Sequence, residues 1–403
     1  MRPSLNFRHT FAEINISHLK HNLRQLRNLV PEGTFFCPMV KSYAYGHGDL
    51  QVVSALIEEG VTDVGVALLE EGVRLREAGF KKININVFGP FDLEGAKTLF
   101  KYELTPMISD FRQLRFLQQS ILSEQQIEIH LKMNTGMNRL GFSSMEIPEI
   151  KQFLNEFPRI KLRGLCTHLS KGEDMGCEGS FSLKQLQEFE KITNQFPQNN
   201  LVTHVLNSSG LLGLFTLSQQ EPWQRYWPVG VRPGIALYGV LPSFKSEKVN
   251  SEVIKKLKLK PVMCLKSEVI QVHELEPGES VSYGNEWVAQ QKSVIGVMPV
   301  GYADGYTRHL SNKGVLILGG KKIPVIGIVC MDYTLVDLTK LLAQGIIKSS
   351  QEAVGKELTL FGESKTGDYY PVEELAKKAG TIAYELLACI GKRVPRQYLK
   401  EHQ

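Results

Sequence analysis

Eight short runs rich in valine, isoleucine and leucine recur between residues 17 and 240, and segments with the helical spacing of apolar residues separate them. Parallel strands joined by crossover helices produce this alternation. Eight repeats within about 225 residues favour a (β/α)8 TIM-type barrel, because an open doubly wound sheet usually has fewer strands and a glycine-rich first turn. The predicted strands cover residues 34–41, 63–67, 85–89, 104–109, 127–134, 161–169, 203–209 and 231–239.

The clearest predicted helix covers residues 17–30. Leu19, Leu23 and Leu26 follow the spacing of one buried helical face. Ser17 stands where a side-chain oxygen can accept a hydrogen bond from an amide of the first turn, so it is the expected N-cap of this helix.

The pattern of the chain changes after residue 240. A lysine-rich stretch over residues 243–261 leads into short strands punctuated by glycine and proline, which predict a mainly β domain. Glutamates interrupt the lysines, so a solvated surface explains the stretch better than a nucleic-acid site does. We therefore predict a barrel domain over residues 1–240 and a β domain over residues 241–403, and the first residues, up to about residue 12, could pair with the second domain.

Composition excludes several classes of protein. The chain has 47 Lys and Arg against 42 Asp and Glu, and this net charge of +5 is too small to indicate a nucleic acid or another polyanion as partner. No apolar run approaches the roughly 18 residues of a membrane span, and the start lacks an apolar leader region, so we expect a cytoplasmic protein without a membrane partner. The six cysteines include no CxxC pair, so neither a disulfide nor a metal site is predicted.

Polar residues follow several of the predicted strands, and in a barrel the carboxyl ends of the strands face the catalytic mouth. Lys41 ends the first run. An ammonium beside a buried strand must be paired or must lose its proton more readily. A lysine with a lowered pKa is a nucleophile suited to forming a Schiff base, and a structural ion pair is the alternative.

Further polar groups lie at the ends of the later strands. Barrels commonly hold a phosphate near strands seven and eight, with a hydroxyl and free backbone amides as ligands. A reactive amine, phosphate donors and arginines together suit pyridoxal phosphate. These further groups are Lys132, Arg139, His168, His204, Asn207, Ser208, Ser209, Arg232, Gly234 and Ile235.

Nine sequence blocks, spread over nearly the whole chain, resemble those of the alanine racemase family in content and in order. Any one block would be weak evidence for this resemblance, whereas nine blocks in the same order are specific evidence for it. The blocks are VKSYAYGHG, KMNTGMNRLGF, CTHLS, LNSSG, VRPGIALYG, VSYGNEW, GYADGY, GIVCMDY and TIAYELL. The first block departs from the family, with Ser42 and Tyr43 where alanine and asparagine or aspartate are usual.

The family consists of pyridoxal phosphate enzymes of fold type III. The resemblance implies that Lys41 holds pyridoxal 5'-phosphate as an aldimine and that Arg232 faces the pyridine nitrogen, with His204 supporting this arginine. Because a guanidinium does not give up its proton, the ring nitrogen is expected to stay unprotonated. The resemblance also implies that His168 lies against the cofactor ring. The phosphate ligands that it implies are Tyr45, Ser208, Gly234, Ile235 and Tyr384.

Racemisation is simplest with bases on both faces of the substrate carbon. The resemblance assigns Lys41 to the D-enantiomer and Tyr283 to the L-enantiomer, and it implies that Tyr283 reaches the site from the other subunit of a homodimer. The β domain would then complete the partner's active site. Arg139 and the backbone amide of Met331 resemble the groups that hold the substrate carboxylate.

Two further residues are interpreted through the same resemblance. Lys132 stands where some members of the family carry a carbamylated lysine that orients the substrate-binding arginine, and an unmodified lysine in an ion pair is the alternative. Tyr302 is expected to line a narrow entrance that favours alanine. One methylene changes the preference of a pocket by only ~1 to 3 kcal/mol, so minor activity on serine is expected.

The function that the resemblance implies is that of an alanine racemase, an isomerase that interconverts L-alanine and D-alanine and supplies D-alanine for peptidoglycan. A broad-specificity racemase, usually exported, would carry a leader. A decarboxylase of basic amino acids on the same barrel should lack the paired motifs of Lys41 and Tyr283 and the arginine at position 232. A non-catalytic pyridoxal phosphate carrier would have the barrel alone.

Overall fold

The computed structural model describes residues 8–122, 124–196, 201–226, 229–364, 367 and 369–399. It divides into two compact units. We call the first the barrel unit, which comprises residues 19–44 and 49–260. The second, the β unit, comprises residues 1–18, 45–48 and 261–403.

The strands of the barrel unit pair in parallel and in the order of the chain. They are β2 (Asp63–Val66), β3 (Asn84–Val87), β4 (Thr105–Ile108), β5 (Ile127–Lys132), β6 (Ile160–Cys166), β7 (Val202–Leu206) and β8 (Gly230–Val231). Each one falls within two residues of the start of a run that the sequence predicts as a strand.

The first predicted strand occupies the eighth position and closes the barrel. Phe36 bridges Val231 of β8, and Met39 bridges Gly65 of β2, both in parallel. Only isolated bridges form here, because Pro38 has no backbone N–H to donate to a regular ladder. The predicted (β/α)8 barrel is confirmed.

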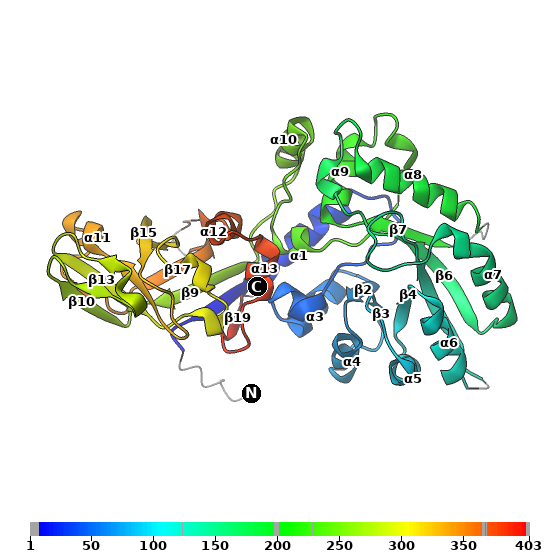
Figure 1. Cartoon of the computed structure of the whole chain (residues 1–403), viewed down its shortest axis with the longest axis horizontal. Coiled ribbons are helices and arrows are strands. Elements are labelled where there is room, and N and C mark those ends of the chain that lie inside the picture. The colour runs from blue at the N-terminus through cyan, green and yellow to red at the C-terminus, as the bar shows by residue number, and fades with distance from the viewer. Residues whose placement is uncertain are drawn as a thin grey trace. The chain divides into compact units, whose positions relative to one another are not determined.

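Helices surround the parallel strands of the barrel (Figure 1). The helices up to residue 260 are α1 (Ile16–Arg27), α2 (Lys41–Tyr45), α3 (Asp49–Glu58), α4 (Leu69–Glu77), α5 (Leu93–Lys101), α6 (Phe111–Ser120), α7 (Ile147–Glu156), α8 (Phe181–Thr193), α9 (Ser208–Leu217) and α10 (Glu247–Lys256). Side-chain caps begin several of them, and Asp92 and Asp110 accept hydrogen bonds from first-turn amides of α5 and α6.

The first helix begins one residue earlier than predicted. Asn15 Oδ1 accepts a hydrogen bond from the His18 amide at 3.0 Å. The prediction that Ser17 caps this helix is wrong, because the helix starts at Ile16 and the Asn15 side chain already satisfies the first turn.

The interior of the barrel unit is mostly apolar. Leu19, Leu23 and Leu26 of α1 are at most 1% exposed, which confirms the predicted buried face. Two histidines are exceptions inside the barrel, since His130 of β5 and His204 of β7 are both 0% exposed. Buried polar rings need hydrogen-bond partners, so these two must be accounted for at the site.

The β unit is built on one ten-stranded, mainly antiparallel sheet. The strand order is β10-β13-β16-β15-β14-β17-β9-β1-β19, and β18 pairs with β17. The bounds are β1 (Phe11–Asn15), β9 (Met263–Glu268), β10 (Gln271–Leu275), β13 (Ser293–Met298), β14 (Val315–Leu318), β15 (Lys321–Ile326), β16 (Thr334–Asp337), β17 (Glu357–Glu363), β18 (Tyr369–Tyr370) and β19 (Arg396–Leu399). A hairpin of β11 (Ser280–Val281) and β12 (Trp287–Val288) and the helices α11 (Thr339–Ala343), α12 (Val372–Ala379) and α13 (Ala383–Ala388) complete the unit.

A buried ion pair joins three neighbouring strands of this sheet. Lys266 Nζ of β9 lies 2.6 Å from Glu13 Oε2 of β1 and 3.1 Å from Glu357 Oε1 of β17. Burial alone would lower the pKa of Lys266, but its contacts with Glu13 and Glu357 raise it. The lysine therefore stays charged, and it fixes β1, which precedes the barrel in sequence, within the β unit.

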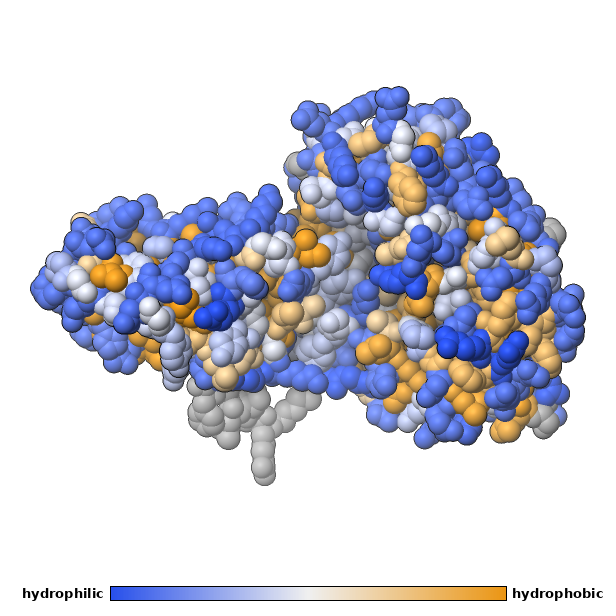
Figure 2. Space-filling model, viewed as in Figure 1, coloured by the Kyte–Doolittle hydropathy of each residue, from blue (hydrophilic) through white to orange (hydrophobic). Residues whose placement is uncertain are grey.

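Hydrophilic side chains cover much of the face in Figure 2, with hydrophobic ones scattered between them. Scattered apolar side chains are normal on the surface of a folded protein. Among the described residues, no helix has the length and apolar character that crossing a membrane would require.

Candidate active site

Arg232 follows β8 at the carboxyl ends of the barrel strands and is 4% exposed. Its Nη1 donates to His204 Nδ1 at 2.6 Å and to the His204 carbonyl at 2.7 Å. Its Nη2 donates to the carbonyls of Thr167 at 2.7 Å and Val205 at 3.2 Å. Nη2 also lies 3.2 Å from His168 Nδ1. The Nε–H has no acceptor among the described residues, so it is the donor left for a ligand.

The two histidines beside Arg232 are neutral. A guanidinium can only donate, so Nδ1 of both His168 and His204 accepts, and each ring carries its proton on Nε2. Burial first, and then the charge of Arg232, lowers the pKa of both rings well below the usual value. The positive charge at this point therefore belongs to Arg232 alone. A donor that keeps its proton suits an unprotonated pyridine nitrogen.

Lys41 opens a short turn of reversed hand, α2. Ser42, Tyr43 and Ala44 have φ between 52° and 56° and ψ between 43° and 54°, which is the left-handed region. Two hydrogen bonds hold this backbone: the Ala44 amide donates to the Val40 carbonyl, and the Ser42 amide donates to the Glu71 carboxylate. The segment after Lys41 is thus fixed by the fold around it, since such residues rarely adopt this conformation alone.

The charges around Lys41 favour its neutral amine. Burial lowers its pKa first, Arg139 and Arg232 lower it further, and Glu71 acts in the opposite direction. Lys41 forms no ion pair with a described residue, so the structure disfavours the alternative of a structural ion pair. A neutral amine is the form that attacks an aldehyde.

Lys132, the last residue of β5, is 8% exposed. Burial lowers its pKa, and the charges of Arg139 and Arg232 lower it further. It forms no ion pair with any residue of the described ranges, so the alternative of an ordinary ion pair finds no partner there. The mouth therefore concentrates positive charge that an anionic ligand would neutralise.

Arg139 lies in the loop after β5. Asn134 organises this loop, because its Oδ1 accepts from the amides of Gly136 at 3.1 Å and Asn138 at 3.0 Å. Gly141 has φ +125°, and a Cβ there would lie 2.8 Å from the Asn134 nitrogen, so a side chain does not fit. Arg139 is exposed and makes no hydrogen bond to a described residue, which leaves its guanidinium available to a carboxylate.

Two helix starts converge on Ser208. Ser208 is the first residue of α9, and Gly234 directly precedes a 3-10 turn over Ile235–Tyr238. Ser208 Oγ accepts from the Gly234 amide at 3.0 Å and from the Ala236 amide at 3.2 Å. Amides at helix starts carry partial positive charge and bind phosphate. The fold thus brings together three residues, Ser208, Gly234 and Ile235, that the sequence predicts as phosphate ligands.

The other two predicted phosphate ligands lie together in the β unit. The ring centroids of Tyr45 and Tyr384 are 6.2 Å apart. The backbone that follows Tyr45 is held by Arg396 of β19, whose Nη2 donates to the Gly46 carbonyl at 2.9 Å. Each unit therefore presents its own group of predicted cofactor ligands.

Tyr283 follows β11 in the hairpin and is 72% exposed. The residue before it, Ser282, has φ +66°, and its Oγ donates to the Ile328 carbonyl at 2.7 Å. Gly327 has φ +67°, and a Cβ there would lie 2.8 Å from Ser282 Cβ. The hairpin is therefore fixed at Ser282, and the phenol of the next residue is left in solvent.

Met331 is held beside the same hairpin by the contacts of the preceding residue, Cys330. Ser282 Oγ is 3.5 Å from Cys330 Sγ, the Tyr302 amide donates to the Cys330 carbonyl at 3.0 Å, and the Cys330 amide donates to the Tyr333 carbonyl at 2.9 Å. Large side chains around this point are between 43% and 72% exposed. We call them the tyrosine patch: Tyr283, Tyr302, Met331 and Tyr333.

Sequence reasoning missed three residues with a place in this arrangement. Glu71 binds the backbone after Lys41, Ser282 fixes the hairpin of Tyr283, and His130 contacts His204. Of these three residues, only His130 could have been identified from the sequence pattern. It lies two residues before Lys132 in one strand, and residues two apart point to the same face.

Comparisons with known proteins find relatives over nearly the whole chain. The family description "Alanine racemase, N-terminal domain" matches residues 14–242, and "Alanine racemase, C-terminal domain" matches residues 262–398. A protein named alanine racemase from Geobacter sp. strain M21 is 36% identical over 98% of this chain and 100% of its own length. One from Clostridium novyi is 35% identical over 98% of this chain and 96% of its own.

Solved structures of related proteins have the same fold. Alanine racemase from Clostridium difficile has a TM-score of 0.83 and 29% identity, over 97% of this chain and 96% of that one. Alanine racemase from Bartonella henselae, solved with covalently bound pyridoxal phosphate, has a TM-score of 0.80 and 26% identity, over 97% and 99% of the two chains. By sequence over nearly its full length and by fold, this chain belongs to the alanine racemase family.

Proposed function

We propose that this protein racemises alanine with pyridoxal 5'-phosphate as its cofactor. The observation that carries the proposal is the setting of Arg232: it is buried, its Nη atoms bind neutral acceptors, and its Nε–H remains for a ligand. This donor fits a pyridine nitrogen that stays unprotonated. The related protein from Bartonella henselae was solved with the same cofactor bound covalently, which supports the assignment.

The residues of the mouth fit the other parts of this cofactor. Lys41 would hold its aldehyde carbon, His168 would lie against its ring, and Ser208 with the amides of Gly234 and Ile235 would bind its phosphate, together with Tyr45 and Tyr384. When bound to the substrate nitrogen, the cofactor supplies an electron sink that acidifies the α-proton. Arg232 limits that sink, since it cannot protonate the ring, and this favours proton exchange over transamination.

Two side chains would move the proton. Lys41 Nζ would accept the α-proton of D-alanine and return one to the same face, and burial, which lowers its pKa, favours the neutral amine that this role needs. The phenol oxygen of Tyr283 would serve the opposite face for L-alanine. Arg139 and the Met331 amide would hold the substrate carboxylate, which orients the α-carbon between the two bases.

The exposure of Tyr283 supports a homodimer with shared sites. A catalytic base in open water would have no fixed position, and the tyrosine patch around it leaves large apolar side chains uncovered. A partner barrel would cover the patch and accept the phenol at its mouth. Two-fold pairing gives each site one barrel and one foreign tyrosine.

The setting of Lys132 supports a second part of the proposal, its carbamylation. Burial lowers its pKa and so favours the neutral amine, which is the form that reacts with CO2, and the added carboxylate would balance the cations of Arg139 and Arg232. An intact-mass measurement in bicarbonate should show the CO2 increment in the wild type and not in Lys132→Ala. An unmodified mass in both would contradict this part.

One experiment tests the activity. The purified protein should show the absorbance of a lysine-bound cofactor and form D-alanine from L-alanine. Lys41→Ala should lose both, whereas Lys81→Ala, which removes an exposed lysine ahead of β3, should keep both. A colourless wild type would refute the cofactor, and a coloured one that makes no D-alanine would refute the reaction.

A mixing experiment tests the shared site. Lys41→Ala and Tyr283→Phe should each be inactive alone. In a dimer of one of each, one site has both changes and the other has neither, so random exchange should restore about a quarter of the wild-type activity. If chain exchange is demonstrated and activity still does not recover, Tyr283 acts within its own chain. We place this reaction in the cytoplasm, where it would supply D-alanine for peptidoglycan.

A further inference from the structure

A second histidine extends the contacts of Arg232 into the barrel. His204 Nε2 lies 2.9 Å from His130 Nδ1, and both rings are 0% exposed. Because Arg232 donates to His204 Nδ1, the His204 ring keeps its proton on Nε2 and donates it to His130. His130 then accepts at Nδ1 and carries its own proton on Nε2. The hydrogen bonds run in one direction, away from the mouth.

Glycines in the neighbouring strands leave room for this contact. Gly164 of β6 pairs with His130 of β5, and a Cβ at Gly164 would lie 2.6 Å from His130 Nδ1. Gly230 of β8 pairs with His204 of β7, and a Cβ there would lie 2.7 Å from His204 Cβ. A side chain at either position would force the two rings to move.

The surroundings keep His130 uncharged. Burial first, and then Arg163 and Arg232, lowers the pKa of His130 to about 3. Arg163 is itself paired with Asp63, with Nη2 and Oδ1 3.1 Å apart. A neutral His130 can accept a hydrogen bond at Nδ1, whereas an imidazolium could not.

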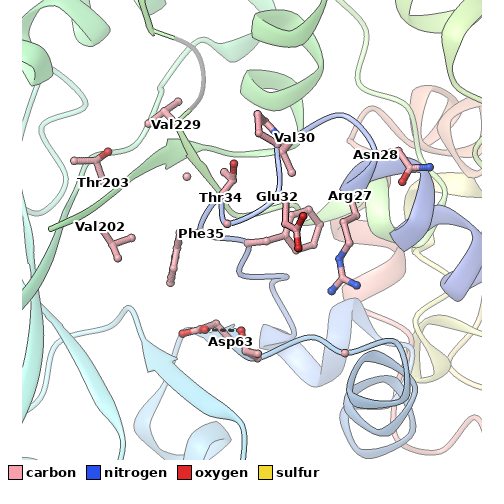
Figure 3. Close-up of a pocket in the computed structure, with 16 residues that line it drawn as sticks. Arg27, Asn28, Val30, Glu32, Thr34, Phe35, Asp63, Val202, Thr203 and Val229 are labelled. Carbon is pink, nitrogen blue, oxygen red and sulfur yellow. Dashed lines mark hydrogen bonds between the residues drawn. The ribbon is translucent and has the colours of Figure 1, made fainter. Parts of the chain in front are cut away.

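An aromatic ring in the wall of a cavity packs against this pair. A cavity of about 1150 Å³ opens at the amino ends of the strands, and Phe35 lies in its wall with Val202 and Asp63 (Figure 3). The Phe35 ring centroid is 5.7 Å from that of His130 and 4.7 Å from that of His204. Both histidines have no exposed surface, although this cavity lies close by.

We propose that His130 is a positioning residue for the reaction, an inference that rests on the proposed function. It fixes His204 in the Nε2–H form, so His204 presents only an acceptor to Arg232. Arg232 Nη1 then keeps His204 Nδ1 as an acceptor beside the His204 carbonyl, and its Nε–H stays directed to the ligand. A chain of hydrogen bonds strengthens each member, so the outer acceptor also tightens the inner contact.

The first test reads the tautomers directly and needs no turnover. Nitrogen NMR of histidine-labelled holoenzyme, assigned with single variants, should show His204 and His130 both neutral and both protonated on Nε2 between about pH 6 and 8. A titration of His130 in that range, or an Nδ1–H form of His204, would overturn the proposal.

The second test removes the outer acceptor. His130→Leu should lower kcat roughly tenfold, the size expected for one buried hydrogen bond, and leave KM unchanged, because Arg232 does not hold the substrate. His130→Asn places a carbonyl oxygen near the position of Nδ1 and should restore kcat. His273→Leu, at an exposed position of β10, is the matched control and should leave both constants as they are.

The outcomes separate this proposal from the function on which it rests. An unchanged kcat in His130→Leu would overturn it, and so would a loss that His130→Asn does not restore. If His130→Leu does not fold, the histidine tautomers decide, together with the kcat of His130→Asn. That kcat is expected to lie near the wild-type value. A protein that binds the cofactor without making D-alanine refutes the function, and the tautomers then still show whether the histidine chain exists.

Discussion

Acid should destabilise this protein through its buried neutral histidines. His130 and His204 are 0% exposed, and their pKa values are lowered, that of His130 to about 3. Unfolding exposes both rings to water, where a histidine has a pKa of about 6.5. The unfolded state therefore binds more protons than the folded one. The free energy of unfolding should be highest above about pH 6.5 and should fall as the pH drops below it.

The size of this effect follows from the two residues. Between pH 7 and 5.5, a histidine that is neutral when folded and has a pKa of about 6.5 when unfolded costs about 1.3 kcal/mol of stability. The pair therefore costs about 2.5 kcal/mol, a large part of a stability of roughly 5 to 15 kcal/mol. The lowered pKa of His168 acts in the same direction.

Urea unfolding followed by far-ultraviolet circular dichroism at several pH values measures this loss. His130→Asn removes one of the two groups, so its loss over the same range should be smaller by about 1.3 kcal/mol. His273→Asn, at an exposed position, should show the full loss. A wild-type loss below about 1 kcal/mol, or an equal loss in His130→Asn, would refute the reasoning.

Two further predictions concern the site. Arg232→Glu should protonate the cofactor ring and raise transamination relative to racemisation, and a product assay that finds no pyruvate above the wild-type level would count against it. Gly327→Ala should push Ser282 and so displace the base beside it, with a fall in kcat for L-alanine, because the new Cβ would lie 2.8 Å from Ser282 Cβ. Gly345→Ala has nearly the same φ, +68°, and nothing within 4 Å, so it should cost stability of about 1 kcal/mol without that fall in kcat. Equal kinetic losses in the two variants would show that the contact is irrelevant.

The fold could be predicted because it depends on periodicity, which is local. Apolar runs marked the strands, and the leucines of α1 marked its buried face. The prediction was least accurate where one residue changes the local backbone: Pro38 reduces the first strand to bridges, and Asn15 replaces Ser17 as the cap. Such features depend on single hydrogen bonds, which a hydrophobic pattern does not encode.

The motifs identified the candidate residues but not the contacts between them. The pairing of His130 with His204 requires the register of three strands and a glycine at position 164 between them. The left-handed backbone at Ser42 and Ser282 had no signal, because serine rarely adopts it and only the surrounding fold requires it. Contacts set by register and by strained backbone are tertiary properties, and no spacing along one segment reveals them.

The reversed turn after Lys41 brings two opposing effects to position 43. A left-handed conformation costs a residue such as tyrosine roughly 1 to 2 kcal/mol, and asparagine less. The Tyr43 ring offsets part of this cost, because Arg74 Cζ lies 5.5 Å from its centre, a cation–π contact of ~0.5 to 1 kcal/mol. Tyr43→Asn should therefore change the free energy of unfolding by less than about 1 kcal/mol in urea titrations, and a larger change would contradict this balance.

The same turn also bears on when a newly made chain can capture its cofactor. Residues 42–44 would not hold left-handed angles in a short peptide, and the Glu71 carboxylate that binds them comes from a later helix, α4. A nascent chain that has emerged only as far as Lys41 therefore has the lysine without its geometry. Vitamin B6 loading should follow barrel closure and not precede it, so ribosome-bound fragments should remain colourless until β8 has been synthesised.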